Sequence, residues 1–230
     1  MRSMPWTIVS GWFFTFGRLR PTRALPGASI SRATQDADPM SDSSRDPNSD
    51  PDDPGPGCGA EGFDPMEPAD LRRRAEAEPG NWAWWFRLGV RCDVHAYDRQ
   101  AVAALRRCLL IAPRNGLARY KLARILVGMD REEEAEVQLE EATRVRPDLQ
   151  DAWVLLGYLR TDWGRWEEAL PALRRAVELR PDGDVFWEIA KCLWQMERYA
   201  EGDRALEACL RWKPNHVPAR EIFLSLATGK

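Results

Sequence analysis

The sequence predicts an all-α fold in which antiparallel helix pairs stack into a solenoid. The first observation is a fixed period, because four prolines follow one another at separations of 34, 34 and 33 residues: Pro113, Pro147, Pro181 and Pro214. The second is that bulky apolar residues recur at i, i+3 and i+7 between these prolines. A repeat of this length is typical of stacked helical units rather than of a single globular core.

Alignment of the copies on their prolines shows which positions the period preserves. The first helix of each copy carries a bulky aliphatic residue followed by a small one: Leu88-Gly89, Leu122-Ala123, Leu156-Gly157 and Ile189-Ala190. The second helix carries a small residue four positions before a leucine: Ala101 and Leu105, Ala135 and Leu139, Ala169 and Leu173, Gly202 and Leu206. Small residues in register with large ones predict a close approach of the two helices in each pair.

Taken in order, the elements begin with a short helix over residues 68–78, which starts at Pro68, a favoured first helical residue. We expect Leu71 and Ala75 of this helix to face the first full repeat. Full repeats follow over residues 82–115, 116–149, 150–182 and 183–216. A last helix after Asn215 should cover the end of the stack with Ile222, Phe223 and Leu226. Residues 130–133 are interpreted as a capping box that opens a helix.

These residues resemble the tetratricopeptide repeat family over residues 67–230. The third copy carries the pattern most fully: Trp153, Leu156, Gly157, Trp166, Ala169, Leu173, Ala176 and Pro181. The resemblance implies a right-handed solenoid of four repeats, with a half-repeat at its N-terminal end and a capping helix at its C-terminal end. The chain departs from the pattern at Arg119, where an aromatic residue is expected, and at Arg160, where tyrosine or leucine is usual. Each departure is expected to weaken one local contact.

The chain is predicted to consist of an N-terminal extension over residues 1–64, disordered or targeting, and a repeat domain over residues 65–230, and charge is uneven along it. Residues 1–35 hold five arginines and no acidic residue, whereas residues 36–80 hold 13 acidic and four basic residues. The residues between 36 and 65 are too polar to fold alone and are predicted to be disordered. The repeats are nearly neutral and the whole chain has a net charge of −3, so no nucleic-acid partner is predicted.

Residues 5–16 form a mostly apolar run with arginines on both sides. The run is short for a transmembrane helix, and no cleavage site typical of a secretory signal follows it. Three interpretations stay open: an organelle-targeting segment, a membrane tether, and an extension upstream of a start at Met40.

No catalytic, cofactor-binding or metal-binding set is predicted. The two histidines, His95 and His216, have no carboxylate or cysteine at ligand spacing. The five cysteines include no C-x-x-C pair, and Cys108 and Cys209 occupy positions where other copies have alanine. Buried free thiols explain them, and reduced thiols favour a cytoplasmic location. An enzyme is therefore not expected.

The resemblance also implies a binding site, because the first helices of successive repeats line a concave groove in this family. Carried onto this chain, the predicted partner-binding residues are Tyr120, Arg124, Val127, Tyr158, Trp187, Lys191 and Trp194. Phe86, Val90, Asp93, Val154 and Thr161 occupy matching positions, and Phe86 and Val154 could equally pack against a neighbouring repeat. Family members that bind chaperone tails carry a lysine and an asparagine where Phe86 and Val90 stand, so such tails are poor ligands.

Two functions follow from these observations. The first is a non-catalytic scaffold that binds a peptide or a helix of another protein in the groove. The second is a structural subunit of a membrane-associated assembly, tethered only through residues 5–16.

A chain that begins at Gly62 should unfold at the same temperature as the whole chain, because the removed residues lack the apolar repeat positions. Thermal unfolding followed by circular dichroism checks this. A midpoint lowered by several degrees would mean that the extension contributes to the stability of the repeats.

Overall fold

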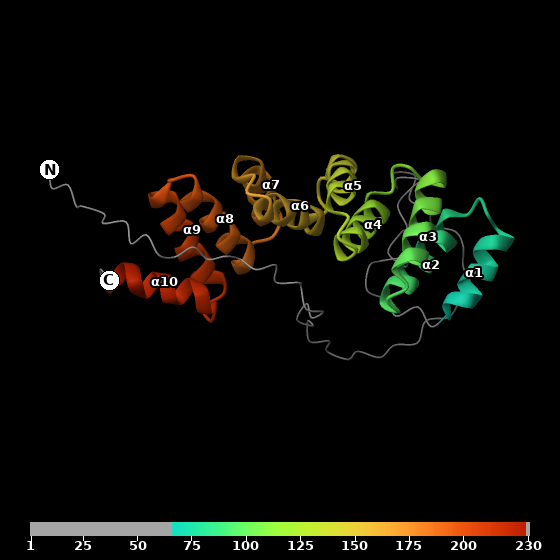
Figure 1. The fold of residues 1–230 in the computed structure, drawn as a ribbon, viewed down its shortest axis with the longest axis horizontal. Coiled ribbons are helices and arrows are strands. Elements are labelled where there is room, and N and C mark those ends of the chain that lie inside the picture. The colour runs from blue at the N-terminus through green and yellow to red at the C-terminus, as the bar shows by residue number, and fades with distance from the viewer. Residues whose placement is uncertain (1–65, 229–230) are drawn as a thin grey trace, which may run out of the picture. The chain divides into compact units, whose positions relative to one another are not determined.

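The computed structural model describes residues 66–228, which fold into ten α-helices (Figure 1). They belong to one compact unit, Asp46–Lys230. In order, the helices are α1 (Pro68–Ala77), α2 (Trp82–Val94), α3 (Asp98–Ile111), α4 (Gly116–Gly128), α5 (Glu132–Val145), α6 (Gln150–Asp162), α7 (Trp166–Leu179), α8 (Gly183–Gln195), α9 (Tyr199–Trp212) and α10 (Val217–Thr228). The four predicted repeats thus appear as the pairs α2–α3, α4–α5, α6–α7 and α8–α9.

Helices that follow one another pack side by side, and each pair also contacts the next pair. The first helices of the repeats additionally contact one another, α2 with α4, α4 with α6 and α6 with α8. These four helices therefore form one row, which we call the inner row. The all-α solenoid predicted from the period is confirmed.

In the first and third repeats, a leucine of the second helix lies directly over a glycine of the first. A methyl group added at Gly89 would lie 2.6 Å from Cγ of Leu105, and one added at Gly157 would lie 2.4 Å from Cδ2 of Leu173. At these distances each leucine would have to shift to make room for a larger residue. The repeat leucines of the second helices, at 105, 139, 173 and 206, are at most 1% exposed.

The apolar core of the described residues falls into two clusters. The first runs from Leu71 to Leu159 and includes Ala172, and the second runs from Ala169 to Ala219. The half-buried indole of Trp153 packs against both. The two clusters therefore meet inside the third repeat.

The turn between the two helices of each repeat contains one residue in the left-handed region. These residues are Ala96, Asp130, Gly164 and Glu197, with φ values of 58°, 58°, 71° and 59°. Only the third repeat has glycine, the residue that adopts this conformation without strain. The predicted capping box is wrong, because Asp130 occupies this turn and the helix N-cap is Arg131, whose side chain makes no capping hydrogen bond.

Arg119 does not weaken the second repeat in the way the sequence suggested. The indole N–H groups of Trp85 and Trp153 donate to the carbonyls of Pro79 and Pro147, at 3.2 and 3.0 Å. At the matching position, the Arg119 guanidinium donates to the Pro113 carbonyl at 3.1 and 2.7 Å. The hydrogen bond that ties a helix to the preceding proline is thus preserved with a different donor.

Arg160 likewise replaces an apolar contact by an ion pair. Its guanidinium lies 2.8 Å from Glu136 of the preceding repeat and also binds Glu140. Arg165 reaches the other oxygen of Glu136 at 2.9 Å. Arg160 and Glu136 are each only 14% exposed, so this pair joins the second and third repeats in a largely buried position.

The two end helices differ in how well they match expectation. Leu71 and Ala75 of α1 are fully buried, as predicted. In α10, Ala219 is buried and Ile222 packs on the second cluster, but Phe223 and Leu226 remain 42% and 46% exposed, so their predicted part in the cap is wrong.

Among α1–α10, no helix combines the length and apolarity needed to cross a membrane. Residues 5–16 and the predicted boundary at residue 65 involve residues outside the described range, so both interpretations stay predictions.

Replacement of Ala96 by glycine should stabilise the protein by up to about 1 kcal/mol, because it removes the penalty of a left-handed alanine. The matched control is Ala103→Gly, at an exposed site inside α3, which should cost about 1 kcal/mol. Urea unfolding of both variants gives the comparison. Equal destabilisation by the two changes would contradict this account of the turn.

Candidate functional site

The seven residues predicted to bind a partner lie on α4, α6 and α8 of the inner row, and all are half-buried. Of the residues at matching positions, Phe86 is only 3% exposed and belongs to the first core cluster. Thr161 is 4% exposed and its hydroxyl donates to the Gly157 carbonyl at 2.9 Å. Phe86 and Thr161 are therefore packing residues, whereas the seven predicted residues keep part of their surface in solvent.

The α4 part of the inner row is basic. Arg124 forms an ion pair with Asp93 of α2. The ammonium of Lys121 lies 5.7 Å from the centroid of the Tyr120 ring. Burial raises the pKa of Asp93 although Arg124 and Lys121 oppose this shift. The α4 part of the inner row thus carries an aromatic ring and two cations.

The α6 and α8 part of the inner row carries carboxylates. Glu188, whose side chain is 18% exposed, forms an ion pair with Lys191, whose Nζ lies 2.7 Å from Oε2 of Glu188. Burial raises the pKa of Glu188, Lys191 lowers it, and the carboxylates of Asp162 and Asp184 raise it again. Burial also raises the pKa of the Tyr158 phenol, with Glu188 and Asp184 adding to the effect, so the phenol keeps its proton.

Trp187 and Trp194 meet edge to face, with ring centroids 6.0 Å apart. The Trp194 indole donates to Asp203 of α9 at 3.1 Å. A methyl group at Gly202 would lie 2.4 Å from the Trp194 ring, so the indole packs directly on the α9 backbone. Trp194 thus joins α8 to α9, while Trp187 extends the aromatic surface of the inner row.

The sequence did not predict the charged groups that lie next to Trp187. The ammonium of Lys213 lies 2.7 Å from Asp184, and Nε2 of His216 lies 3.5 Å from the same carboxylate. The His216 ring lies 5.1 Å from Trp187, and its Nδ1 accepts a hydrogen bond from the Ala219 amide at the start of α10. His216 therefore lies beside a carboxylate that spacing along the sequence does not reveal, because Asp184 belongs to α8.

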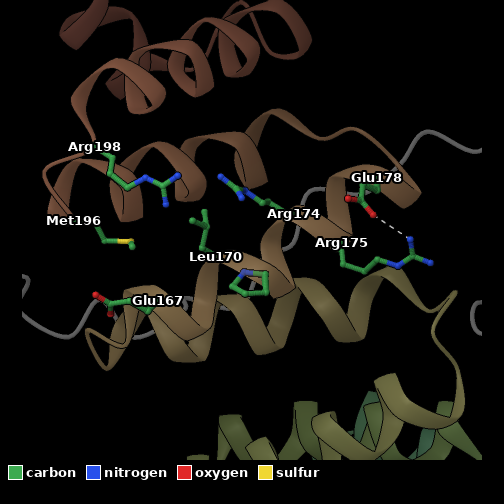
Figure 2. Close-up of a pocket in the computed structure, with 8 residues that line it drawn as sticks. Glu167, Leu170, Arg174, Arg175, Glu178, Met196 and Arg198 are labelled. Atoms are coloured by element: carbon green, nitrogen blue, oxygen red, sulfur yellow. Dashed lines mark hydrogen bonds and ion pairs between the residues drawn. The ribbon is translucent and has the colours of Figure 1, made fainter.

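A pocket of about 460 Å³ lies outside the inner row, along α7 and the turn that follows α8 (Figure 2). Leu170, Pro171 and Met196 supply its apolar surface. Arg174 and Arg198 point toward it, and Arg175 is paired with Glu178 at 3.1 Å (Figure 2).

Within residues 66–228, no cluster of histidine, cysteine and acidic residues could hold a metal ion. Cys92, Cys108, Cys192 and Cys209 are free and buried. Burial raises the pKa of the Cys209 thiol to about 11 and raises those of Cys92 and Cys192. Thiols held in the protonated form are weak nucleophiles, and these cysteines act as small core residues.

Comparison of the sequence with family models gives two matches, each described as tetratricopeptide repeat. They cover residues 99–157 and residues 162–216. No curated protein matches the sequence.

Solved structures of similar fold include YrrB, described as a TPR protein with an unusual peptide-binding site. The TM-score is 0.62 at 21% identity, over 66% of this chain and 79% of that one. A MamA structure gives 0.61 at 16% identity, over 66% and 89% of the two chains. MamA from residue 41 onward from Desulfovibrio magneticus RS-1 gives 0.58 at 17% identity, over 65% and 85%. At these identities the likeness is one of fold.

The raised pKa of Glu188 predicts how Glu188→Gln changes the pH dependence of stability. Above its folded pKa the carboxylate is charged and destabilises the fold, and this penalty is relieved as the pH falls through the folded pKa toward about 4.5. The melting temperature of the unchanged protein should therefore rise relative to Glu188→Gln as the pH is lowered from about 7 to about 4.5.

Glu168→Gln is the matched control, since a hydrogen bond from Arg165 lowers the pKa of Glu168. The stability supplied by Glu168 is present above its unfolded pKa and is lost only as the pH falls through the lower folded value. Thermal unfolding between pH 7 and about 4.5 should therefore show the change for Glu188→Gln and little change for Glu168→Gln. Parallel curves would contradict the assignment of Glu188.

Proposed function

Because the chain belongs to the tetratricopeptide repeat family, we propose that its repeats form a non-catalytic scaffold for another protein. A peptide or a helix of that partner binds along the inner row. The partner is a protein, and neither a nucleic acid nor a cofactor takes part. A cytoplasmic location and a tether through residues 5–16 remain part of the proposal only as expectations from the sequence.

The observation that carries this proposal is the aromatic surface of the inner row. Tyr120, Tyr158 and Trp187 stand on three successive inner helices, and each is half-buried. Large rings held in place by packing give much contact area and lose little conformational entropy on binding. The similar fold of YrrB, described as having a peptide-binding site, supports the same class of ligand.

Charges beside the rings add specificity. Arg124 and Lys191 are each paired with a carboxylate on the inner row, and these pairs are partly exposed. Partly exposed ion pairs can exchange partners at modest energetic cost. Association should therefore weaken with salt without being abolished.

Trp187→Ala should weaken association with a partner recovered by affinity purification by about 2 kcal/mol, the loss typical of an aromatic anchor. Titration calorimetry measures the affinity, and circular dichroism should show unchanged helix content. Trp194→Ala is expected to lower the melting temperature as well, because its indole packs on α9.

Arg174→Glu serves as the control, since Arg174 borders the outer pocket and not the inner row. Binding should be unaffected by this reversal. If Arg174→Glu abolishes association while Trp187→Ala leaves it intact, the partner binds at the outer pocket and the groove proposal is wrong.

A further inference from the structure

The residue that precedes the first helix of a repeat caps that helix with its side chain in three of the four repeats. A side-chain oxygen at this position accepts a hydrogen bond from an amide of the first turn: Asn81 at 3.1 Å, Asn115 at 2.9 Å and Asp182 at 2.8 Å. Leu149, at this position in the third repeat, makes no such bond. Each cap satisfies an amide that has no acceptor within its own helix.

His216 occupies the same position before α10, since it follows Pro214 by two residues as Asn115 follows Pro113. Its Nδ1 accepts a hydrogen bond from the Ala219 amide at 3.1 Å, three residues on, as the Asn115 side chain does from the amide three residues on. A ring nitrogen that accepts a hydrogen bond carries no proton. The cap of α10 therefore exists only while the imidazole is neutral, with its single proton on Nε2.

The imidazole of His216 lies in a largely enclosed position against α8, because its side chain is only 10% exposed. Nε2 lies 3.5 Å from Asp184 of α8, and the ammonium of Lys213, which follows α9, lies 2.7 Å from the same carboxylate. The ring of Trp187 lies 5.1 Å from the imidazole. The charged residues of α10 itself are both exposed: Arg220 and Glu221.

The pKa of His216 is lowered from its ordinary value of 6.5. Burial is the largest cause, and Lys213 and Lys191 act in the same direction, whereas Asp184 and a backbone hydrogen bond raise the pKa. The stability that the neutral ring gives to α10 is therefore fully present above about pH 6.5. It is lost as the pH falls from there toward the lower pKa of the folded chain.

Few side chains hold α10 on the stack. Ala219 is fully buried and Ile222 packs on the second core cluster, whereas Val217, Phe223 and Leu224 are exposed. Among the described helices, α9 is the main neighbour of α10. Because so little apolar surface is buried, the loss of one cap shifts the balance between attached and detached α10.

We propose that His216 makes the attachment of α10 to the repeats depend on pH. When the ring gains its second proton, Nδ1 becomes a donor that faces the Ala219 amide, and the cap is lost. Attraction between the charged ring and Asp184 offsets only part of this loss, because Lys213 already pairs with that carboxylate. Detachment of α10 uncovers the end of the second core cluster. The inference goes beyond the proposed function, since it holds whether or not the inner row binds a partner.

Amide hydrogen exchange of the whole chain, measured by mass spectrometry on a peptide that covers residues 217–228, tests the proposal. Its protection, corrected for the intrinsic exchange rate, should fall several-fold between about pH 7.5 and about pH 5.5. The fall should not exceed about tenfold per pH unit, because detachment is coupled to the uptake of one proton. A peptide from α2, whose cap is Asn81, should keep its protection. Unchanged protection of the α10 peptide over this range would overturn the proposal.

His216→Asn replaces the titrating cap by the residue that the chain uses at Asn81 and Asn115. The variant should keep α10 attached and remove the pH dependence of its protection. Only the slopes against pH are compared, so an equal change of protection at every pH does not affect the result. A slope in His216→Asn as steep as that of the unchanged protein would overturn the proposal.

Asp184→Asn supplies an independent measurement, because Asp184 raises the pKa of His216. Without this carboxylate the ring should take up its proton at lower pH, so the loss of α10 protection should begin at lower pH than in the unchanged protein. A loss that begins at the same or a higher pH would show that another group controls the attachment of α10, and would overturn the proposal.

Discussion

The structure depends on the close approach of the two helices within each repeat. In the first and third repeats a leucine of the second helix lies over a glycine of the first, so closely that the leucine would have to shift if a methyl group were added. Ala123 and Ala190 take this position in the other two repeats and are fully buried. The separation of the helices sets how far the next pair can rotate, and therefore which residues of the first helices share the inner row.

The period of the sequence was enough to predict the helices and most of the core, because burial repeats with the same spacing in every copy. The predicted repeat limits coincide with the starts of α2, α4, α6 and α8. The failures involve side chains whose partners are not set by the period. Arg119 and Arg160 were each expected to weaken a local contact, but each finds an acceptor within reach of its long side chain. Asp130 looked like a helix cap, but the turn geometry that all four repeats share decides its place.

The candidate site was predictable in position and less so in chemistry. The resemblance implied that Tyr120, Tyr158 and Trp187 lie on the first helices of successive repeats, and the structure has them on α4, α6 and α8. The carboxylate contacts of His216 and Lys213 join residues about thirty positions apart, and helix periodicity carries no information on them. Gly202 was a usable signal for Trp194, because a glycine in place of the usual alanine makes room for a large ring on the opposite helix.

The division of the core into two clusters has a consequence for the way the chain opens. Each pair contacts its neighbours in sequence, so the end carrying α9 and α10 can lose its order while the α2–α4 end keeps its packing. Amide hydrogen exchange in such an array is graded from one end to the other and does not report a single global event. A ligand that contacts residues of both core clusters stabilises them together, so the two clusters unfold together and the graded transition becomes a cooperative one.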